Sequence, residues 1–445
     1  MNRKKRAAFL TLGCKVNQYE TDAMKELLEE DGYEVVDFTE PADVYVINTC
    51  SVTNMADRKS RQMVHRAKKK NPDAVIVAAG CYVQAAKETL EEQGMADILI
   101  GNNKKKDIAR ILEKYFEKKE SISEILDIAK EKEYESLHIH KVSEHTRAYV
   151  KIQDGCNQFC SYCIIPYARG RIRSKAPKEV VKEILALAEA GYQEVVLTGI
   201  HLSSYGKDLG DTDLLDIIFK VQEIEGIRRI RLGSLEPRII TEEFVKGLVK
   251  CDKVCPHFHL SLQSGCDATL KRMNRHYNTE EYEEALAVLK KYYEHPALTT
   301  DVIVGFVGET EEEFEQTRKF LEKIQLYEMH IFKYSVRKGT RAEKMSGHLP
   351  EKRKTDRSAV LLSMAKKHKR AYEEWYIGKE EEVLLEEMIE INGISYMQGY
   401  TKRYVKIAVQ LDENTKKFRQ NQIVVVKIEG ILEESMLWGK VSIEF

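Results

Sequence analysis

Long hydrophobic runs are absent from this chain of 445 residues. No stretch approaches the roughly 20 consecutive apolar residues of a membrane-spanning helix. The N-terminal MNRKKRAAFLTLGC is basic, but its apolar part is too short for a signal peptide. We therefore expect no membrane partner and a cytoplasmic location. Hydrophobic residues still make up 43% of the chain, which is enough for the cores of two or three soluble domains.

The chain also has no surplus of acidic or of basic residues. The chain has 71 lysines and arginines against 72 aspartates and glutamates, so its net charge of −1 says nothing about nucleic-acid binding. Two local runs, residues 58–70 and 351–370, are strongly basic. A solvated helix face is the ordinary interpretation of such runs, and contact with RNA is the alternative. Repeats of solenoid period are also absent, which excludes that class of fold.

Three apolar, β-branched segments, residues 7–13, 43–49 and 74–80, are each followed by an amphipathic helical pattern. This alternation predicts an α/β domain over residues 1–118, built on a doubly wound parallel sheet. The highly charged residues 119–141 predict a linker.

The alternation of strands and helices resumes over residues 142–372. Six strand candidates lie there, which favours a partial (β/α)6 barrel over a full barrel of about 250 residues. They are residues 147–155, 194–200, 229–234, 257–263, 301–306 and 329–335. Residues 373–445 have short strands without helices, split by turns at 391–393 and 412–414. They predict a small antiparallel β-barrel.

The nine cysteines are expected to be reduced in the cytoplasm, so patterned cysteines indicate metal ligation or catalysis. Cys156, Cys160 and Cys163 form CNQFCSYC directly after the first strand of the predicted barrel. Zinc sites use two CxxC pairs or add histidines, and no second half lies nearby. Thiolates hold Fe–S clusters, which favours such a cluster here. A zinc knuckle and structural cysteines are the alternatives.

The CxxxCxxC loop in this place resembles the radical S-adenosylmethionine (SAM) superfamily. The resemblance implies a [4Fe–4S] cluster on the three cysteines, SAM on the fourth iron, and Tyr162 as the family's aromatic residue before the last cysteine. Reductive cleavage of SAM then gives a 5′-deoxyadenosyl radical. Because ligands bind at the carboxyl ends of barrel strands, the next strand ends supply the candidate SAM contacts, with ordinary loop residues as the alternative. These contacts are Gly199, Ser234, Glu236, Gln263 and Gly305.

Cys14, Cys50 and Cys81 end the three predicted strands of the first domain. All three belong at one edge of a parallel sheet, where the loops converge. Three thiolates again leave one position open, so they predict a second cluster with an exchangeable iron. Three unrelated core cysteines are the alternative.

With both cysteine sets, the chain resembles the methylthiotransferases. The segments that carry the resemblance include TLGCKVNQYET, NTCSVT, AGCYVQ, DGCNQFCSYCIIPYARGRIRS and DVIVGFVGETEEEF. It covers nearly the whole chain and implies a methylthiotransferase N-terminal domain, a radical SAM domain and a TRAM-like RNA-binding domain. It also implies two [4Fe–4S] clusters, two SAM molecules per turnover, a sulfur donor and a flavodoxin- or ferredoxin-like electron donor.

Within this family, TLGCKVNQYE and IIPYARGRIRS are most like the enzymes that act on N6-threonylcarbamoyladenosine. These make its 2-methylthio form at position 37, beside the anticodon, in tRNAs that read ANN codons. The expected partner is therefore tRNA. The alternatives are N6-isopentenyladenosine in tRNA, an aspartate of a ribosomal protein, or a non-enzymatic Fe–S protein that binds RNA.

Candidate RNA contacts are basic residues near the cluster loop and in the C-terminal module. Arg169, Arg171 and Arg173 share one face if their segment is a strand, and guanidinium groups suit phosphate or the threonylcarbamoyl carboxylate. Pairing with acidic residues of the barrel is the alternative. Arg337 adds charge near the last barrel strand. Residues 399–406 combine aromatic and basic side chains suited to RNA, with an ordinary amphipathic strand as the alternative. These side chains are Tyr400, Lys402, Arg403, Tyr404 and Lys406.

Three further cysteines, Cys251, Cys255 and Cys266, match no cluster position. The first two could form a zinc site with His257 and His259. Buried or surface thiols are the favoured interpretation, because the histidines belong to a predicted barrel strand.

Overall fold

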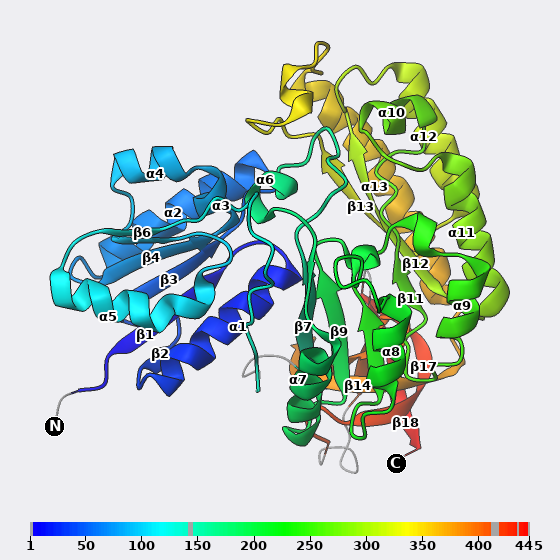
Figure 1. Cartoon of the computed structure of the whole chain (residues 1–445). Helices are drawn as coiled ribbons and strands as arrows, with labels where there is room; N and C mark the ends of the chain where they lie inside the picture. The colour runs from blue at the N-terminus through cyan, green and yellow to red at the C-terminus, as the bar shows by residue number, and fades with distance from the viewer. Residues whose placement is uncertain (1–2, 141–145, 411–417, 434–435, 444–445) are drawn as a thin grey trace.

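The computed structural model describes residues 3–140, 146–410, 418–433 and 436–443, and contains two α/β units and a β-barrel (Figure 1). The first unit is a six-stranded parallel sheet in the order β2-β1-β3-β4-β5-β6. Its strands are β1 (Arg6–Thr11), β2 (Glu34–Val36), β3 (Val44–Thr49), β4 (Val75–Gly80), β5 (Ile98–Ile100) and β6 (Ile122–Glu124). Its helices are α1 (Lys15–Glu30), α2 (Asn54–Lys70), α3 (Cys81–Ala85), α4 (Lys87–Gln93) and α5 (Ile108–Lys118).

The predicted doubly wound sheet is confirmed. Every residue of β3 and β4 is buried, as expected for parallel strands covered by helices on both faces. Strand β6 lies inside the predicted linker and pairs with β5. Ile128, Leu137 and Ile139, also in that linker, are buried. The domain boundaries themselves stay a prediction.

Six parallel strands form the second unit, and the predicted partial (β/α)6 barrel is confirmed. They are β7 (Arg147–Asp154), β9 (Glu194–Gly199), β10 (Arg229–Leu232), β11 (His257–His259), β12 (Ala297–Val304) and β13 (Glu328–Lys333). Isolated parallel bridges join β10 to the segment around β11, and the short β8 (Arg173–Ser174) adds antiparallel to β7. The helices are α6 (Ile165–Arg169), α7 (Pro177–Glu189), α8 (Leu214–Gln222), α9 (Glu242–Leu248), α10 (Asp267–Arg272), α11 (Thr279–Tyr292), α12 (Glu311–Ile324) and α13 (Glu351–Glu374).

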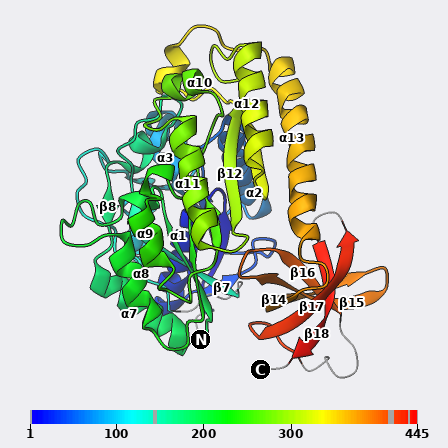
Figure 2. The same ribbon diagram turned by 90° about the vertical axis from the view of Figure 1, so that its right-hand side faces the viewer.

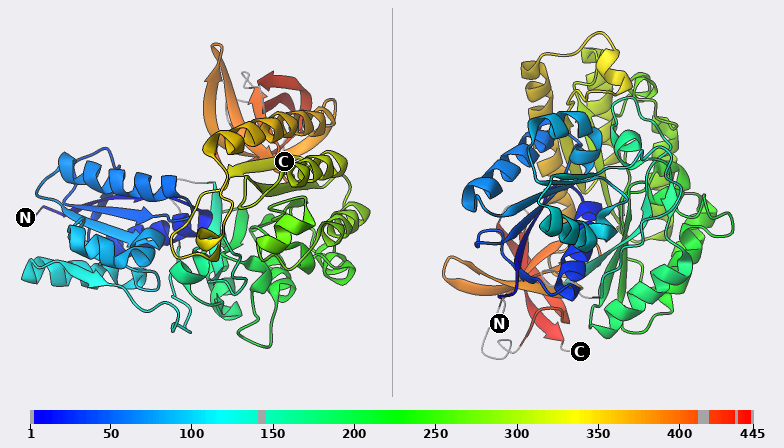
Figure 3. Two further views of the ribbon diagram at one scale, coloured as in Figure 1. Left: turned by 90° about the horizontal axis from the view of Figure 1, so that it is seen from above. Right: turned by 60° about the vertical axis from the view of Figure 1, so that its left-hand side comes forward.

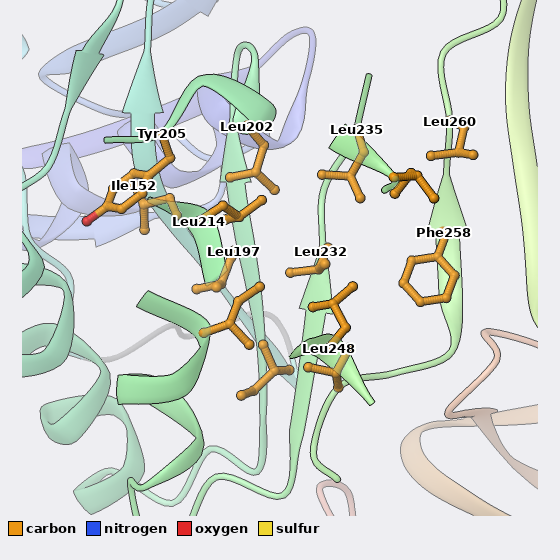
Figure 4. Packing of buried hydrophobic residues seen from close by; sticks show 14 of the residues in the cluster. Ile152, Leu197, Leu202, Tyr205, Leu214, Leu232, Leu235, Leu248, Phe258 and Leu260 are labelled. Carbon is orange, nitrogen blue, oxygen red and sulfur yellow. The ribbon is translucent and has the colours of Figure 1, made fainter. Parts of the chain in front are cut away.

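Alternate side chains of these strands divide between the helices and the barrel interior. Ile152, Leu197 and Leu232 belong to the main hydrophobic core (Figure 4). Their neighbours in sequence, such as Lys151 and Arg231, face the other way and are buried and charged. The barrel therefore has an apolar shell and a polar interior.

The C-terminal unit is a closed five-stranded barrel in the order β14-β15-β16-β18-β17, at the opposite end of α13 from the β13–α13 loop (Figure 2). Its strands are β14 (Glu380–Ile391), β15 (Ile394–Thr401), β16 (Lys406–Gln410), β17 (Ile423–Glu433) and β18 (Met436–Ile443). The predicted small barrel is confirmed, although β16 and β18 pair in parallel. The predicted turn at 412–414 lies outside the described residues. Among those residues, no helix is long and apolar enough to span a membrane.

Candidate functional site

The loop of Cys156, Cys160 and Cys163 leaves β7 through Gly155, which has a left-handed φ of +71°. A Cβ on Gly155 would lie 1.8 Å from the carbonyl oxygen of Arg171, so only glycine fits this turn. Burial raises the pKa of Cys156 to about 11 and that of Cys163 to about 12, and Cys160 adds to both shifts. The three thiols therefore lie close enough to feel one another's charge. A reduced set of three thiols fits an Fe–S cluster.

Arg275 is a cation that contacts this loop. Its Nη1 donates a hydrogen bond to Cys160 Sγ at 3.2 Å, and its Nε donates to the hydroxyl oxygen of Tyr277 at 2.9 Å. Tyr162 packs edge-on against Phe306, with ring centroids 6.2 Å apart. The loop is thus anchored by Tyr162 to the segment that follows β12, and it is held electrostatically by Arg275.

Glu236 lies beside the cysteine loop, as a SAM contact would. Its Oε2 accepts a hydrogen bond from Gln158 Nε2 at 3.4 Å and lies 3.5 Å from His201 Nε2. Gln158 and Glu236 line a cavity of about 750 Å³ together with Ser203. Ser234, two residues earlier, is exposed. A polar cavity next to the cysteines can take a ribose or an amino acid group.

The other three candidate SAM contacts have visible structural roles. A Cβ on Gly199 would lie 2.9 Å from the side chain of Gln153, and one on Gly305 would lie 2.5 Å from Lys354 Cγ. Gln263 has a φ of +71° and donates its backbone N–H to Asp301 O at 2.9 Å. These positions are constrained by packing and turns, so their contact with SAM stays a prediction.

Cys14, Cys50 and Cys81 converge at the carboxyl edge of the first sheet. Cys14 caps α1, Cys50 follows β3 and Cys81 begins α3. A Cβ on Gly13 would lie 3.0 Å from Cys50 Sγ. Burial raises the pKa of Cys14 and raises that of Cys50 to about 11, and the nearby Cys81 thiol adds to both shifts. All three thiols are free, and they fit the donor set of a second cluster.

Asn17 ties these cysteine loops together. Its Nδ2 donates to the carbonyl oxygens of Leu12 at 2.7 Å and Thr49 at 3.0 Å, which end β1 and β3. Asn17 is buried at the first turn of α1. One amide therefore aligns the residues before Cys14 and Cys50.

Arg169 was predicted to contact RNA, and this prediction is wrong. The side chain is fully buried at the end of α6. Its Nη1 donates to Glu20 at 2.8 Å and to Asp154 at 3.2 Å, and its Nε donates to Cys81 Sγ at 3.2 Å. The guanidinium thus reaches from the barrel into the first unit, where it pairs with the buried Glu20, while Asp154 of β7 binds it from the barrel side.

The predicted shared face of Arg169, Arg171 and Arg173 is also wrong. Only Arg173 is in a strand, and it is buried, with its Nη2 donating to Arg169 O at 2.9 Å. Arg171 alone is exposed, and it lies over the ring of Phe159 at 4.5 Å. The prediction fails because the chain turns at Gly170, which has a φ of +74°.

Arg337 is buried against the first unit and does not face RNA. Its Nη2 donates to Asp57 at 2.7 Å and to Ser51 Oγ at 2.8 Å, and its Nη1 donates to Asn54 at 2.8 Å. Ser51 directly follows Cys50. The loop after β13 is therefore attached to α2 and to the second cysteine set.

The aromatic and basic stretch 399–406, predicted to contact RNA, packs against the barrel. The rings of Tyr400 and Tyr404 stack at 4.7 Å, and Arg147 lies over both, 4.9 and 4.7 Å from their centroids. Arg231 Nη1 donates to Lys402 O at 3.1 Å.

The charged side chains of this stretch also have partners within the chain. Lys402 pairs with Glu382 at 3.3 Å and Arg403 with Glu381 at 3.2 Å. Lys406 is half-buried. All five side chains are half-buried against the barrel, so an RNA patch here stays a prediction.

The unassigned cysteines do not form the zinc site considered from the sequence. Cys251, Cys255 and Cys266 are buried. In the described part of the chain, no cluster of potential metal ligands contains any of them. Cys266 Sγ lies 3.1 Å from Gln316 Oε1. They are core thiols, as favoured.

Several buried charged residues at the junction escaped sequence reasoning. Lys151 Nζ donates to Glu20 at 3.0 Å and to Asp154 at 3.2 Å, and Lys105 Nζ donates to Glu20 at 2.7 Å. The one available signal was a lysine among apolar residues of a predicted buried strand, 147–155. Lys105 and Glu20 resemble ordinary solvated helix residues in sequence.

Comparison with known proteins agrees with this architecture. Residues 6–101 match the uncharacterized protein family UPF0004, and residues 150–321 match the Radical SAM superfamily. The chain is similar in fold to the radical S-adenosylmethionine methyltransferase TsrM from Kitasatospora setae. The TM-score is 0.56 at 14% identity, over 74% of this chain and 75% of that one.

Three curated relatives are similar over most of their length. The threonylcarbamoyladenosine tRNA methylthiotransferase MtaB of Bacillus subtilis is 41% identical over 95% of this chain and 93% of its own. The protein of that name from Aquifex aeolicus is 43% identical over 84% and 91%. A tRNA-2-methylthio-N(6)-dimethylallyladenosine synthase of Clostridium botulinum is 37% identical over 84% and 85%. The chain therefore belongs to the radical SAM methylthiotransferases, enzymes that use SAM and a [4Fe–4S] cluster.

Proposed function

We propose that this enzyme converts N6-threonylcarbamoyladenosine in tRNA to its 2-methylthio form. The observation that carries the proposal is that one arginine, Arg169, connects two sets of free cysteines. Arg169 bonds to Cys81 of the first unit. It also ends α6, the helix that follows Cys156, Cys160 and Cys163. Relatives that share 35–43% identity with this chain bear the name of that activity. Relatives named for dimethylallyladenosine are also similar, so the base must be tested directly.

Two groups of residues would hold the iron. Cys156, Cys160 and Cys163 would hold the cluster that binds SAM, and Cys14, Cys50 and Cys81 would hold a second one. When bound, these groups supply a SAM-derived radical and a site for the inserted sulfur, with one SAM as radical source and another as methyl donor. The protein's own contribution is to orient SAM through Glu236 and to hold the thiolates through Arg275 and Arg169.

Lys15 supports a substrate that carries a carboxylate. It follows Cys14 at the start of α1, reaches solvent, and lies 5.9 Å from the ring of Tyr149. No described carboxylate lies within ion-pair distance of its ammonium. Burial and the charges of Arg231 and Arg147 lower the pKa of Lys15 to about 8. Glu194 opposes this shift, and the carboxylate of a threonylcarbamoyl group would further stabilise the ammonium.

Nucleoside analysis tests the proposal. Deletion of the gene should remove 2-methylthio-N6-threonylcarbamoyladenosine from tRNA and leave the 2-methylthio-isopentenyl nucleoside. The reverse pattern assigns the other base. An unchanged nucleoside profile, together with failure of the reduced, reconstituted protein to form 5′-deoxyadenosine, rejects the enzyme.

Iron content tests the two sites. We expect about eight irons per chain and about four after Cys14, Cys50 and Cys81 are changed to alanine. Cys251→Ser is the matched control and should retain all of the iron, because that thiol is buried in the core. Iron unchanged in the triple variant contradicts the second site. A sulfur donor, a flavodoxin- or ferredoxin-like reductant and a cytoplasmic location complete the proposal.

A further inference from the structure

We propose that Arg169 is a positioning residue that sets the reduction potential of the cluster on Cys14, Cys50 and Cys81. The inference rests on the proposed function, since it requires that second cluster. Arg169 belongs to the radical SAM unit, in the helix that follows the CxxxCxxC loop, yet its Nε–H points at Cys81 Sγ, 3.2 Å away in the other unit.

The position of the guanidinium is fixed on every side. Beyond Cys81, its Nη1 bonds to Glu20 and Asp154, and its Nη2 donates to Asn17 Oδ1 at 2.7 Å and to Glu20 at 3.1 Å. No part of the side chain reaches solvent. Because a guanidinium presents its donors in one rigid plane, these bonds leave Nε no direction other than toward the sulfur.

The buried charged residues around Arg169 include more cations than carboxylates. In the described part of the chain, Lys105, Lys151 and Arg169 form ion pairs of 2.7–3.2 Å with two carboxylates, Glu20 and Asp154. The buried Glu135 is a third carboxylate that acts on Lys151. Arg173, 3.9 Å from Asp154, is a fourth cation. In a buried setting this charge is weakly screened, and the Cys81 sulfur is the acceptor that Arg169 faces.

A cation that hydrogen-bonds to a cluster sulfur stabilises the more negative, reduced state. Hydrogen bonds to the sulfurs and net charge are the main means by which proteins tune such clusters. Arg169 should therefore raise the potential of the second cluster and make it easier to reduce. Arg275 bonds to Cys160 in the same way on the other cluster, so each cysteine set has its own arginine.

Redox titration by electron paramagnetic resonance tests the proposal. The parent protein carries Cys156, Cys160 and Cys163 as alanine, so that only the second cluster is observed. Arg169→Lys keeps a charge but loses the planar set of donors. We expect about four irons and a potential lowered by about 59 mV or more, a tenfold change in a one-electron equilibrium.

A second variant should shift the reduction potential in the opposite direction. Glu20→Gln leaves Arg169 in place and removes a negative charge beside it, so the potential should rise. Loosened packing alone would not produce opposite shifts. Arg275→Lys in the same parent is the control and should change nothing, since its own cluster is absent.

The outcomes separate the inference from the proposed function. If the parent binds four irons and neither variant moves the potential, Arg169 is merely structural and the inference is overturned. Should Arg169→Lys fail to fold, the Glu20→Gln shift decides: a rise supports the inference and no shift overturns it. If the parent itself binds no iron, the second cluster is rejected and the inference falls with it.

Discussion

Gly155 shows how much one residue decides at the cluster loop. A Cβ there would lie 1.8 Å from Arg171 O at a φ of +71°. A left-handed conformation alone costs an ordinary residue about 1–2 kcal/mol, and relief of the clash must also displace Cys156. We expect Gly155→Ala to lose about half of the iron and to melt earlier, as measured by iron assay and calorimetry.

Gly32→Ala is the matched control for this prediction. Gly32 also has a left-handed φ, +88°, but a Cβ there meets nothing within 4 Å. Gly32→Ala should lose only the free energy of placing alanine in the left-handed conformation, and the protein should keep all of its iron. Equal iron in both variants would contradict the steric argument.

At single residues, the sequence predicts what local patterns encode. The six cysteines of the two sets follow strands that periodicity identifies, so their approach within each unit was foreseeable. The contacts of Arg169 and Arg337 were not foreseeable, because their partners lie far away in the sequence. Glu20 is 149 positions from Arg169, and Asp57 is 280 positions from Arg337. A basic side chain near a functional loop looks the same in sequence whether it faces RNA or a buried carboxylate.

Among the elements, helix α13 joins the barrel to the C-terminal unit and carries a buried acid. Glu373 is 2% exposed, beside the Lys369–Glu328 ion pair of 2.8 Å. Burial raises the pKa of Glu373 to about 7, helped by Glu328 and opposed by Lys369 and Arg370. Its ionisation therefore weakens the packing of α13 against β13.

The pH dependence of stability follows from this shift. Above its unfolded pKa of 4.5, the native chain retains a proton that the unfolded chain releases, so stability falls as pH rises toward about 7. Glu373→Gln should melt on the order of 2 °C above the wild type at pH 8 and equally at pH 4.5. Glu374→Gln, on the exposed face of the same helix, should show no such dependence. A constant difference at all pH values would contradict the assignment.

For elements, the sequence was sufficient wherever the hydrophobic period was clear. Strands β1, β3 and β4, the six parallel strands of the second unit and the helix over residues 351–370 were predicted, because burial dictates their patterns. The strands β2, β5 and β8, of two or three residues each, were not predicted. Strand β6 was missed, since three residues at a sheet edge carry too little pattern. The parallel β16–β18 pair was missed as well, because closure of the barrel, and not local sequence, brings these strands together.

At the scale of the whole molecule, the three units meet through buried charge. Arg169 and Arg337 extend from the barrel unit into the first unit, and Arg229 Nη1 donates to Tyr400 O of the C-terminal barrel at 3.0 Å. The residues once expected to bind RNA are used in these contacts. Exposed cations remain at Arg171 and on α2 and α13, and these two helices lie on the same side of the molecule (Figures 2 and 3).

Charge reversal on these two helices tests an RNA surface that spans both units. The exposed triads are Lys59, Arg66 and Lys69 on α2, and Lys352, Arg353 and Lys367 on α13. Changing either triad to glutamate should weaken tRNA binding and lower the slope of log K against log salt by about 2, as expected when three phosphate contacts are lost. The control changes Lys178, Lys182 and Lys220, exposed on the outer helices α7 and α8, and should leave the slope unchanged. Since both triads flank the contact between Arg337 and Asp57, each should weaken binding alone. A loss confined to one helix would restrict the RNA to one unit, and no loss from either would remove this surface from the proposal.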